Sequence, residues 1–183
     1  LLNRSSDLLA CELAPIRVNG IHPGIVGDSP YWEGKPLDAE DFAIQAAPGR
    51  ATMTAAVLRP FHWADDFLTF ELPVRDGLVQ RDESRNITKF AIVDRFSGAG
   101  AVSKMFWLGC GPSTPNTALA CSMAHDKHNV WCVGSSDAAM AKAVNALAEN
   151  RGGWALVREG EVVARVRYEI AGLMSCRPAE ALH

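Results

Sequence analysis

Residues 130–167, VWCVGSSDAAMAKAVNALAENRGGWALVREGEVVARVR, hold the clearest secondary-structure signals of the chain. Their first five residues form a short apolar run, which is typical of a buried strand. Ser136 is a favourable N-cap for a helix that runs over residues 137–150 and ends at the RGG segment. The apolar face of this helix contains Met140, Val144 and Leu147.

A hairpin follows the helix, because the alternating apolar residues of 154–170 are interrupted by Glu159-Gly160. Upstream, apolar runs rich in β-branched and aromatic residues predict further strands. They are DDFLTFELPV, ITKFAIVDRF, AVSKMFWLG, TALACSMA and NVWCVGSS. Residues 59–183 therefore predict a strand-rich α+β domain with one main helix and a terminal hairpin.

The first 58 residues have a different pattern. A leucine-rich helix ends at Pro15, and the segment IRVNGI then predicts a buried strand that leads into the turn HPG. Helix, strand and loop form the repeating unit of a parallel sheet, but one such unit lacks the neighbouring strands that it needs. We therefore expect an incomplete α/β, Rossmann-like fragment over 1–58, joined near residue 58 to the second domain.

Part of this first segment resembles short-chain dehydrogenases/reductases. The matching stretches are LLACELAPIRVNGIHPGIVGDSPYW (8–32) and APGRATMTAAVL (47–58), the second of which matches a place where GR precedes a helix in that family. The resemblance implies a vestigial nicotinamide contact at Pro23, Gly24 and Val26. One alternative function is thus a remnant of an NAD(P)-dependent oxidoreductase. The family's glycine-rich loop and catalytic Ser are absent from this sequence.

Tyr31 and Lys35 have the Tyr-x-x-x-Lys spacing of that family's catalytic pair. The chemistry requires both side chains on one face of a helix, so that the ammonium lowers the pKa of the phenol. Pro30, Gly34 and Pro36 disfavour a helix here. We therefore expect an exposed loop and no catalytic role for this pair.

The second domain resembles the C-terminal domain of bacterial adenine deaminases, which belong to the amidohydrolase superfamily. The matching stretches include NITKFAIVDRFSG, the run from ALACSMAHDKHNVWCVGSSD to GEVVARV, and AGLMSCRPAEAL. The resemblance implies part of an enzyme that hydrolyses adenine to hypoxanthine and ammonia. In that family a (β/α)8 barrel holds iron, manganese or zinc, and this sequence contains no such barrel. We expect the chain alone to have no catalytic residues, cofactor or activity, and the barrel domain to be its partner.

The segment HDKHN places His125, Asp126, His128 and Asn129 between two predicted strands. Three interpretations are open. The polar side chains could close a turn by bonding to backbone groups, or they could face adenine bound in the barrel. Alternatively, His125, Asp126 and His128 could bind a metal of their own, which would require a tight turn that brings them together.

Composition limits the remaining possibilities. The chain is 48% hydrophobic and 21% charged, which is typical of a globular protein. A net charge of −3 gives no reason to expect nucleic acid or an anionic membrane as a partner, and no apolar run is long enough to span a bilayer. Five cysteines without a Cys-x-x-Cys pair favour reduced thiols in a cytoplasmic protein. The start is not a signal peptide, and the missing Met suggests a segment of a longer protein.

A non-enzymatic docking or assembly module is the rival hypothesis from another class. In that case aromatic side chains would anchor the domain on a barrel, or on a second copy in a homo-oligomer. The candidate anchors are Trp63, Phe67, Phe70 and Trp107.

Overall fold

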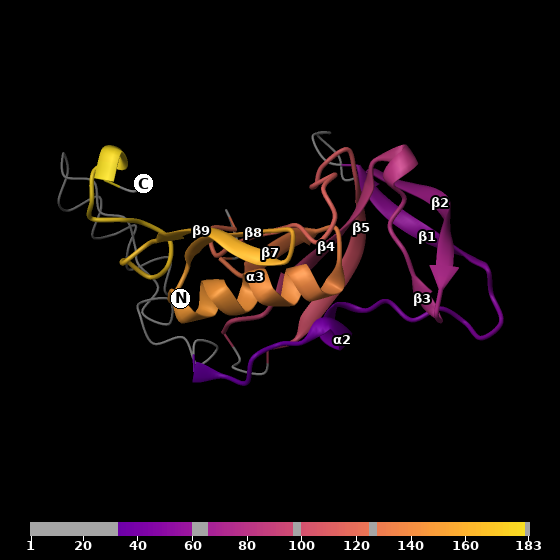
Figure 1. The fold of residues 1–183 in the computed structure, drawn as a ribbon, viewed down its shortest axis with the longest axis horizontal. Coiled ribbons are helices and arrows are strands. Elements are labelled where there is room, and N and C mark those ends of the chain that lie inside the picture. The colour runs from indigo at the N-terminus through magenta and orange to yellow at the C-terminus, as the bar shows by residue number, and fades with distance from the viewer. Residues whose placement is uncertain (1–32, 60–65, 97–99, 125–127, 182–183) are drawn as a thin grey trace, which may run out of the picture.

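A computed structural model of the chain describes residues 33–59, 66–96, 100–124 and 128–181. Within these ranges nine strands form one sheet, in the order β3-β2-β1-β5-β4-β7-β6-β8-β9 (Figure 1). All neighbouring strands are antiparallel except β1 and β5, which are parallel. The sheet is therefore mixed.

The described elements have the following bounds. The strands are β1 (Thr52–Arg59), β2 (Asp66–Arg75), β3 (Leu78–Val79), β4 (Ile87–Val93), β5 (Val102–Leu108), β6 (Ala118–Cys121), β7 (Val130–Gly134), β8 (Gly153–Arg158) and β9 (Glu161–Arg167). The helices are α2 (Ala39–Phe42) and α3 (Asp137–Glu149), and two single 3₁₀ turns are η3 (Glu83–Arg85) and η4 (Ala179–Ala181).

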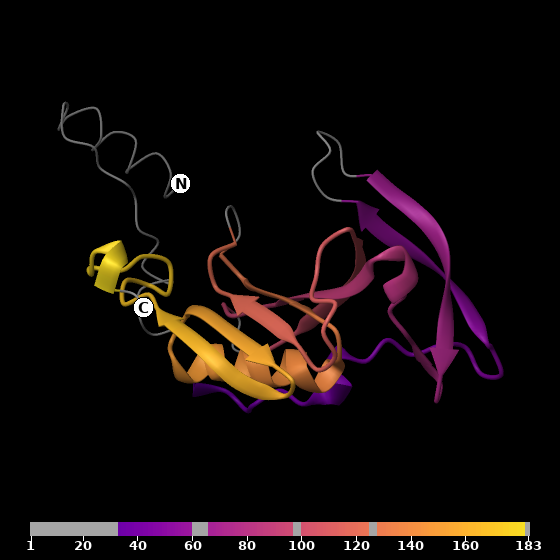
Figure 2. The same ribbon diagram turned by 45° about the horizontal axis from the view of Figure 1, so that its top comes forward.

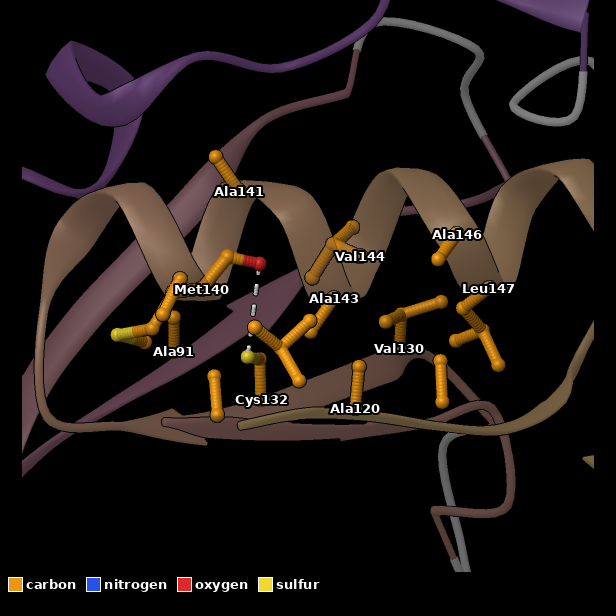
Figure 3. Packing of buried hydrophobic residues seen from close by; sticks show 14 of the residues in the cluster. Ala91, Ala120, Val130, Cys132, Met140, Ala141, Ala143, Val144, Ala146 and Leu147 are labelled. Atoms are coloured by element: carbon orange, nitrogen blue, oxygen red, sulfur yellow. Dashed lines mark hydrogen bonds between the residues drawn. The ribbon is translucent and has the colours of Figure 1, made fainter. Parts of the chain in front are cut away.

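The helix α3 lies on one face of the sheet, over the strands β6 to β9 (Figures 1 and 2). The Ser136 hydroxyl caps it by accepting a hydrogen bond from the Ala139 amide at 3.3 Å. Met140, Val144 and Leu147 are fully buried, as their spacing predicts. They meet a strand surface of small side chains, among them Ala91, Ala120 and Cys132, which lets the helix approach closely (Figure 3).

A second apolar cluster occupies the same face of the sheet beyond the end of α3. Its fully or almost fully buried members are Val57, Leu72, Val79, Ile87 and Phe106. The segment around Ile44 packs against it, and the Ile44 carbonyl accepts a hydrogen bond from the Val79 amide at 2.8 Å. One face of the sheet thus carries both clusters.

The segment before β1 is attached to this face at two points. Asp38 caps α2, whose last residue, Phe42, is fully buried. The Lys89 ammonium donates a hydrogen bond to the Phe42 carbonyl at 3.1 Å and forms an ion pair with Asp137 at the start of α3. The part of this segment around Phe42 is therefore packed against the main helix and the sheet.

The prediction of a strand-rich fold with one main helix and a terminal hairpin is confirmed. Glu159 and Gly160 form the hairpin turn with φ angles of 53° and 81°, the positive values that a two-residue β-turn of this type needs. The helix and strand of the expected Rossmann-like fragment lie in 1–32, outside the described residues. Among the described residues, no helix is long and apolar enough to cross a membrane.

The helix expected after Gly49-Arg50 is wrong, because residues 52–59 form strand β1. Their exposure alternates over the first five positions, and backbone partners flank them on both sides, β2 and β5. These pairings satisfy the backbone of a Thr- and Val-containing segment that has low helix propensity. The predicted domain boundary near residue 58 falls inside this strand. The division of the chain into 1–58 and 59–183 stays a prediction.

Candidate functional site

Several connecting segments meet at one end of the sheet. Because β4, β7, β6 and β8 are antiparallel neighbours, the ends of β4 and β6 lie beside the starts of β7 and β8. The connections that contain residues 94–96, 122–124 and 128–129 therefore come together there with the segment after β9. Four residues of this region, Arg95, Ser122, Asn129 and Gly172, form what we term the sheet-end cluster.

Arg95 is the centre of the cluster and is completely buried. Its guanidinium donates a hydrogen bond to the Ala171 carbonyl at 3.2 Å, and its backbone amide donates to the Asn129 side-chain oxygen at 3.4 Å. Burial lowers the pKa of Arg95 to about 10, and the neighbouring Cys121 partly offsets this shift. The side chain consequently stays protonated at neutral pH. Arg95 joins its own connection to two others, to Ala171 through the guanidinium and to Asn129 through the backbone amide.

Ser122 joins β6 to the segment after β9. Its hydroxyl donates to the Gly172 carbonyl and accepts from the Gly153 amide, the latter at 2.7 Å. Gly152 has φ +102°, and a Cβ there would lie 2.5 Å from the Gly172 Cα. The contact between these two backbone segments thus requires glycine at position 152.

The predicted polar residues divide between described and undescribed positions. His125 and Asp126 lie outside the described residues. His128 has φ +54°, and its amide donates to the Ala124 carbonyl at 2.8 Å, which closes a turn. The Asn129 side-chain oxygen accepts a hydrogen bond from the backbone amide of Arg95, so it binds a neighbouring connection and not its own turn. The roles of all four residues toward a substrate stay predictions.

The described residues of the sheet-end cluster hold the connecting segments in place. Within the described ranges, no group of three or more His, Cys, Asp or Glu side chains could hold a metal ion. Burial raises the pKa of Cys121 to about 11, so its thiol stays protonated and poorly nucleophilic at neutral pH. The cluster therefore fixes the connections that carry His128 and Asn129.

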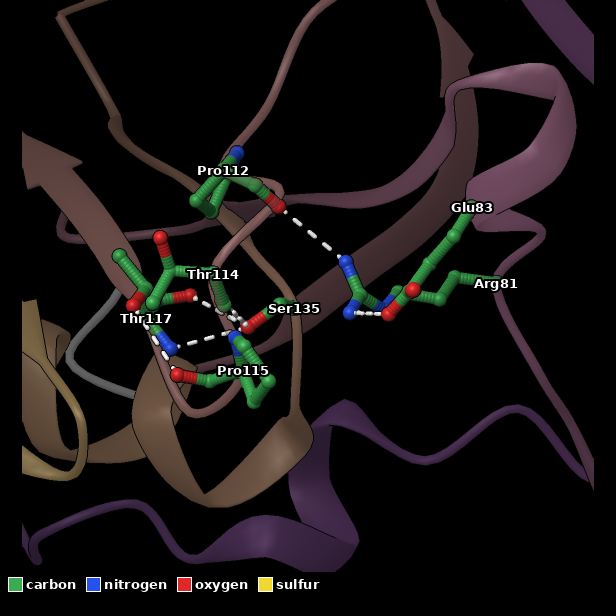
Figure 4. A network of polar contacts seen from close by, with 7 residues as sticks. All are labelled: Arg81, Glu83, Pro112, Thr114, Pro115, Thr117 and Ser135. Carbon is green, nitrogen blue, oxygen red and sulfur yellow. Dashed lines mark hydrogen bonds and ion pairs between the residues drawn. The ribbon is translucent and has the colours of Figure 1, made fainter.

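A second polar network holds the connection between β5 and β6 at the opposite end of the strands (Figure 4). The Ser135 hydroxyl donates to the Thr114 carbonyl at 2.8 Å and accepts from the Thr117 amide at 2.9 Å. Arg81 donates to the Pro112 carbonyl at 3.1 Å and pairs with Glu83. Apart from the exposed Arg81–Glu83 ion pair, these contacts join side chains to backbone groups of the same chain, so this network is structural.

Sequence reasoning missed Arg95 and Ser122, the two buried polar residues that organise the cluster. Both lie near the end of a run that predicted a strand, ITKFAIVDRF and TALACSMA, and just beyond the end of the observed strands β4 and β6. That position was the available signal, because polar side chains at strand ends can bond to neighbouring connections. The partners on the segment after β9 are distant in sequence and leave no local pattern.

Comparison with protein families places the fold in a known group. Residues 65–183 match the model of the family described as the adenine deaminase C-terminal domain, which is more than half of the chain. The chain belongs to the adenine deaminase C-terminal domain family. The region matched by this family model contains strands β2 to β9, helix α3 and the sheet-end cluster.

Curated relatives of this adenine deaminase C-terminal domain support the same membership. The chain is 76% identical over 148 residues to adenine deaminase 1 of Bradyrhizobium sp. (strain ORS 278), which covers 81% of the chain and 24% of the relative. It is 72% identical over 159 residues to adenine deaminase 2 of Bradyrhizobium diazoefficiens, and the match covers 84% of the chain and 25% of that relative. Adenine deaminase of Moorella thermoacetica is 38% identical to the chain over 148 residues, and the match covers 80% of the chain and 24% of that relative. The chain thus spans about a quarter of the length of these relatives.

These matches cover more of the chain than residues 59–183 alone, so the deaminase similarity includes part of the segment before residue 59. The resemblance to short-chain dehydrogenases/reductases is not supported by the comparisons. Pro23, Gly24 and Val26, the expected nicotinamide contacts, lie outside the described residues. The reductase alternative therefore rests on sequence pattern alone.

Proposed function

We propose that this chain acts as the C-terminal domain of an adenine deaminase, whose reaction takes place in a barrel domain that the chain does not contain. The observation that carries this proposal is the 76% identity to a named adenine deaminase over 81% of the chain. The complete enzyme would replace the exocyclic amine of adenine with oxygen from water, giving hypoxanthine and ammonia.

The chain's own residues would contribute to this reaction by orienting the substrate or a neighbouring side chain. Arg95 and Asn129 hold the connection that carries His128, and the turn at His128 is fixed by its backbone bond to Ala124. In the proposed enzyme, His125, Asp126, His128 and Asn129 lie beside the adenine site and orient the substrate or a neighbouring side chain. Positioning of this kind can contribute several kcal/mol to a reaction barrier.

The divalent metal of the complete enzyme, whether iron, manganese or zinc, would be bound by the barrel. The described side chains of this chain do not fit such an ion, since they offer no cluster of three ligands. We propose that the chain alone is inactive toward adenine. A cytoplasmic location and a homo-oligomeric state also remain predictions.

The test uses a chimera, called the complete enzyme below, in which this chain replaces the matching quarter of the Bradyrhizobium sp. relative. Release of hypoxanthine from adenine is measured for the complete enzyme, for the isolated chain and for the relative truncated before the matching quarter. We expect activity from the complete enzyme and none above blank from the isolated chain supplied with iron, manganese or zinc. Turnover by the isolated chain would overturn the proposal, as would a folded but inactive complete enzyme beside an active parent.

A further inference from the structure

The face of the sheet opposite α3 carries a continuous row of apolar side chains. Neither α2 nor α3, the two described α-helices, packs on this face (Figure 2). Alternation along each strand places Trp131 on it, because Val130 and Cys132 point into the core under α3. The strand register then identifies the neighbours of Trp131 on this face.

The row crosses the sheet from β2 to β8. Phe67 pairs with Leu58, and Leu58 pairs with Trp107. On the other side, Trp131 and Trp154 both pair with the small Cys121 between them. We term Leu58, Phe67, Phe90, Trp107, Trp131 and Trp154 the aromatic row.

Ring contacts join four members of the row, Phe90, Trp107, Trp131 and Trp154. Phe90 lies edge-on to Trp107 with centroids 4.5 Å apart and stacks near Trp131 at 6.4 Å. Trp131 in turn meets Trp154 edge-on at 5.5 Å. Aromatic pairs at such distances attract each other beyond the burial of area, so the row has a defined shape before any partner binds.

Hydrogen bonds also fix two of the three indoles of the row, whereas the buried indole N–H of Trp107 has no hydrogen-bond partner among the described residues. The Trp131 indole N–H donates to the Met123 carbonyl at 3.2 Å, and the Trp154 indole N–H donates to the Tyr168 hydroxyl at 3.0 Å. Their polar atoms are thus satisfied within the chain. A partner that covers these rings would not leave an indole N–H unpaired, and little side-chain entropy would be lost.

The row remains open to solvent in the described residues. Phe67 is 56% exposed, and the other five members of the row are partly exposed. Met123, which accepts the Trp131 indole bond, is 45% exposed. An apolar hollow of about 280 Å³ adjoins the row and is lined by Leu119, Val133 and Leu156, among others. Contiguous apolar surface of this kind marks an interaction site on a globular domain.

Resting on the proposed function, we infer that the aromatic row is the surface on which the remaining part of the deaminase polypeptide docks. The chain spans only a quarter of the length of its relatives, so three quarters of such a polypeptide lies outside it and is tethered to it. Trp131 lies two positions after Asn129, and its indole bonds to the carbonyl of Met123, which follows Ser122, so the sheet-end cluster borders the row. Docking there brings His128 and Asn129 to the edge of the interface, where the proposed role requires them.

Two native methionines provide a matched probe of this surface. Met123 is joined to the row by the bond from the Trp131 indole to its carbonyl and is 45% exposed, whereas Met174 lies outside the row and is 51% exposed. Oxidation by dilute peroxide, followed by mass spectrometry, measures the rate at each residue in the isolated chain and in the complete enzyme. We expect Met174 to react at similar rates in both, and Met123 to react at least about tenfold more slowly in the complete enzyme, because a docked domain excludes the oxidant.

A substitution provides a second readout. Phe67→Glu should leave the melting temperature of the isolated chain unchanged within a few degrees but lower that of the complete enzyme and restore Met123 oxidation. Val163→Glu, at a 53% exposed position outside the row, is the matched control and should change neither. An active complete enzyme whose Met123 reacts as fast as in the isolated chain would overturn docking while leaving the proposed function intact. Concentration-dependent protection in the isolated chain alone would also overturn it, in favour of a second copy as the occupant.

Discussion

Asn145 of α3 binds both backbone polar groups of Leu37, a residue 108 positions earlier in the chain. Its side-chain oxygen accepts a hydrogen bond from the Leu37 amide at 3.0 Å, and its side-chain nitrogen donates to the Leu37 carbonyl at 2.7 Å. A strand neighbour makes the same pair of contacts in a sheet. The main helix thereby holds the segment that leads into β1.

Asn145→Ala should lower the free energy of unfolding by about 1–2 kcal/mol, because it removes two partly buried hydrogen bonds and leaves the Leu37 groups to water. Urea denaturation of the isolated chain measures this loss. Glu149→Ala on the same helix is the control, since it removes only an exposed ion pair with Arg165 and should cost less than about 1 kcal/mol. Equal effects of the two substitutions would show that the Leu37 contact does not stabilise the fold.

Phe42→Ala should destabilise the chain by about 3–5 kcal/mol, the usual cost of removing a buried aromatic ring and leaving a cavity. Thermal unfolding followed by circular dichroism measures it. The result also tests whether the segment before β1 belongs to the folded unit. A loss below about 1 kcal/mol would mean that α2 is not packed on α3 and β5 in solution.

His128→Asn should lower adenine turnover by the complete enzyme by roughly ten- to ten-thousand-fold, the range expected for lost positioning or acid–base help. Asn tolerates the positive φ of 54° at this position, so the substitution tests the imidazole with little backbone strain. Metal content, measured by mass spectrometry, should not change. Unaltered turnover would favour a purely structural turn, and loss of bound metal would favour a metal site that includes His128.

In the isolated chain, the same His128→Asn substitution should cost at most about 1 kcal/mol, because the turn bond to Ala124 is donated by the backbone amide, which the substitution keeps. Asn129→Ala should have the larger effect on stability, because its side-chain oxygen accepts a bond from the backbone of buried Arg95. Chemical denaturation of the two variants side by side measures this order. The reverse order would remove the structural role that the geometry gives to Asn129.

Among the cysteines that the structure describes, thiol labelling at pH 8 should modify Cys176 fastest and Cys121 hardly at all. Cys176 is exposed, whereas burial raises the pKa of Cys121 to about 11 and keeps its thiolate fraction very small at this pH. Because the folded pKa exceeds the unfolded value of 9, Cys121 contributes stability that is present below pH 9 and lost as pH rises toward 11. Site-resolved mass spectrometry of labelled chain checks the first point, and comparison with Cys121→Ala across pH 8–11 checks the second.

The local sequence pattern was sufficient to predict those elements whose start or turn is set by neighbouring residues. Ser136 indicates the start of α3, because the free amides at a helix N-terminus need a side-chain acceptor. Glu159-Gly160 marks the hairpin because only a few residues adopt two successive positive φ angles at low cost. The pattern misled over residues 52–59, where family resemblance implied a helix and pairing with two distant strands produced β1 instead.

By itself, the sequence determined the strand-rich composition, the single main helix, its cap, and the motifs that indicate an adenine deaminase domain. Only the tertiary structure decided which face of the sheet α3 covers, and hence that Trp107, Trp131 and Trp154 lie together on the other face. It also decided that Arg95 meets Asn129 and Ala171. The physical reason is that strand order and register join residues far apart in the chain. Hydrogen bonds and ring contacts between such residues leave no periodic signal in the sequence.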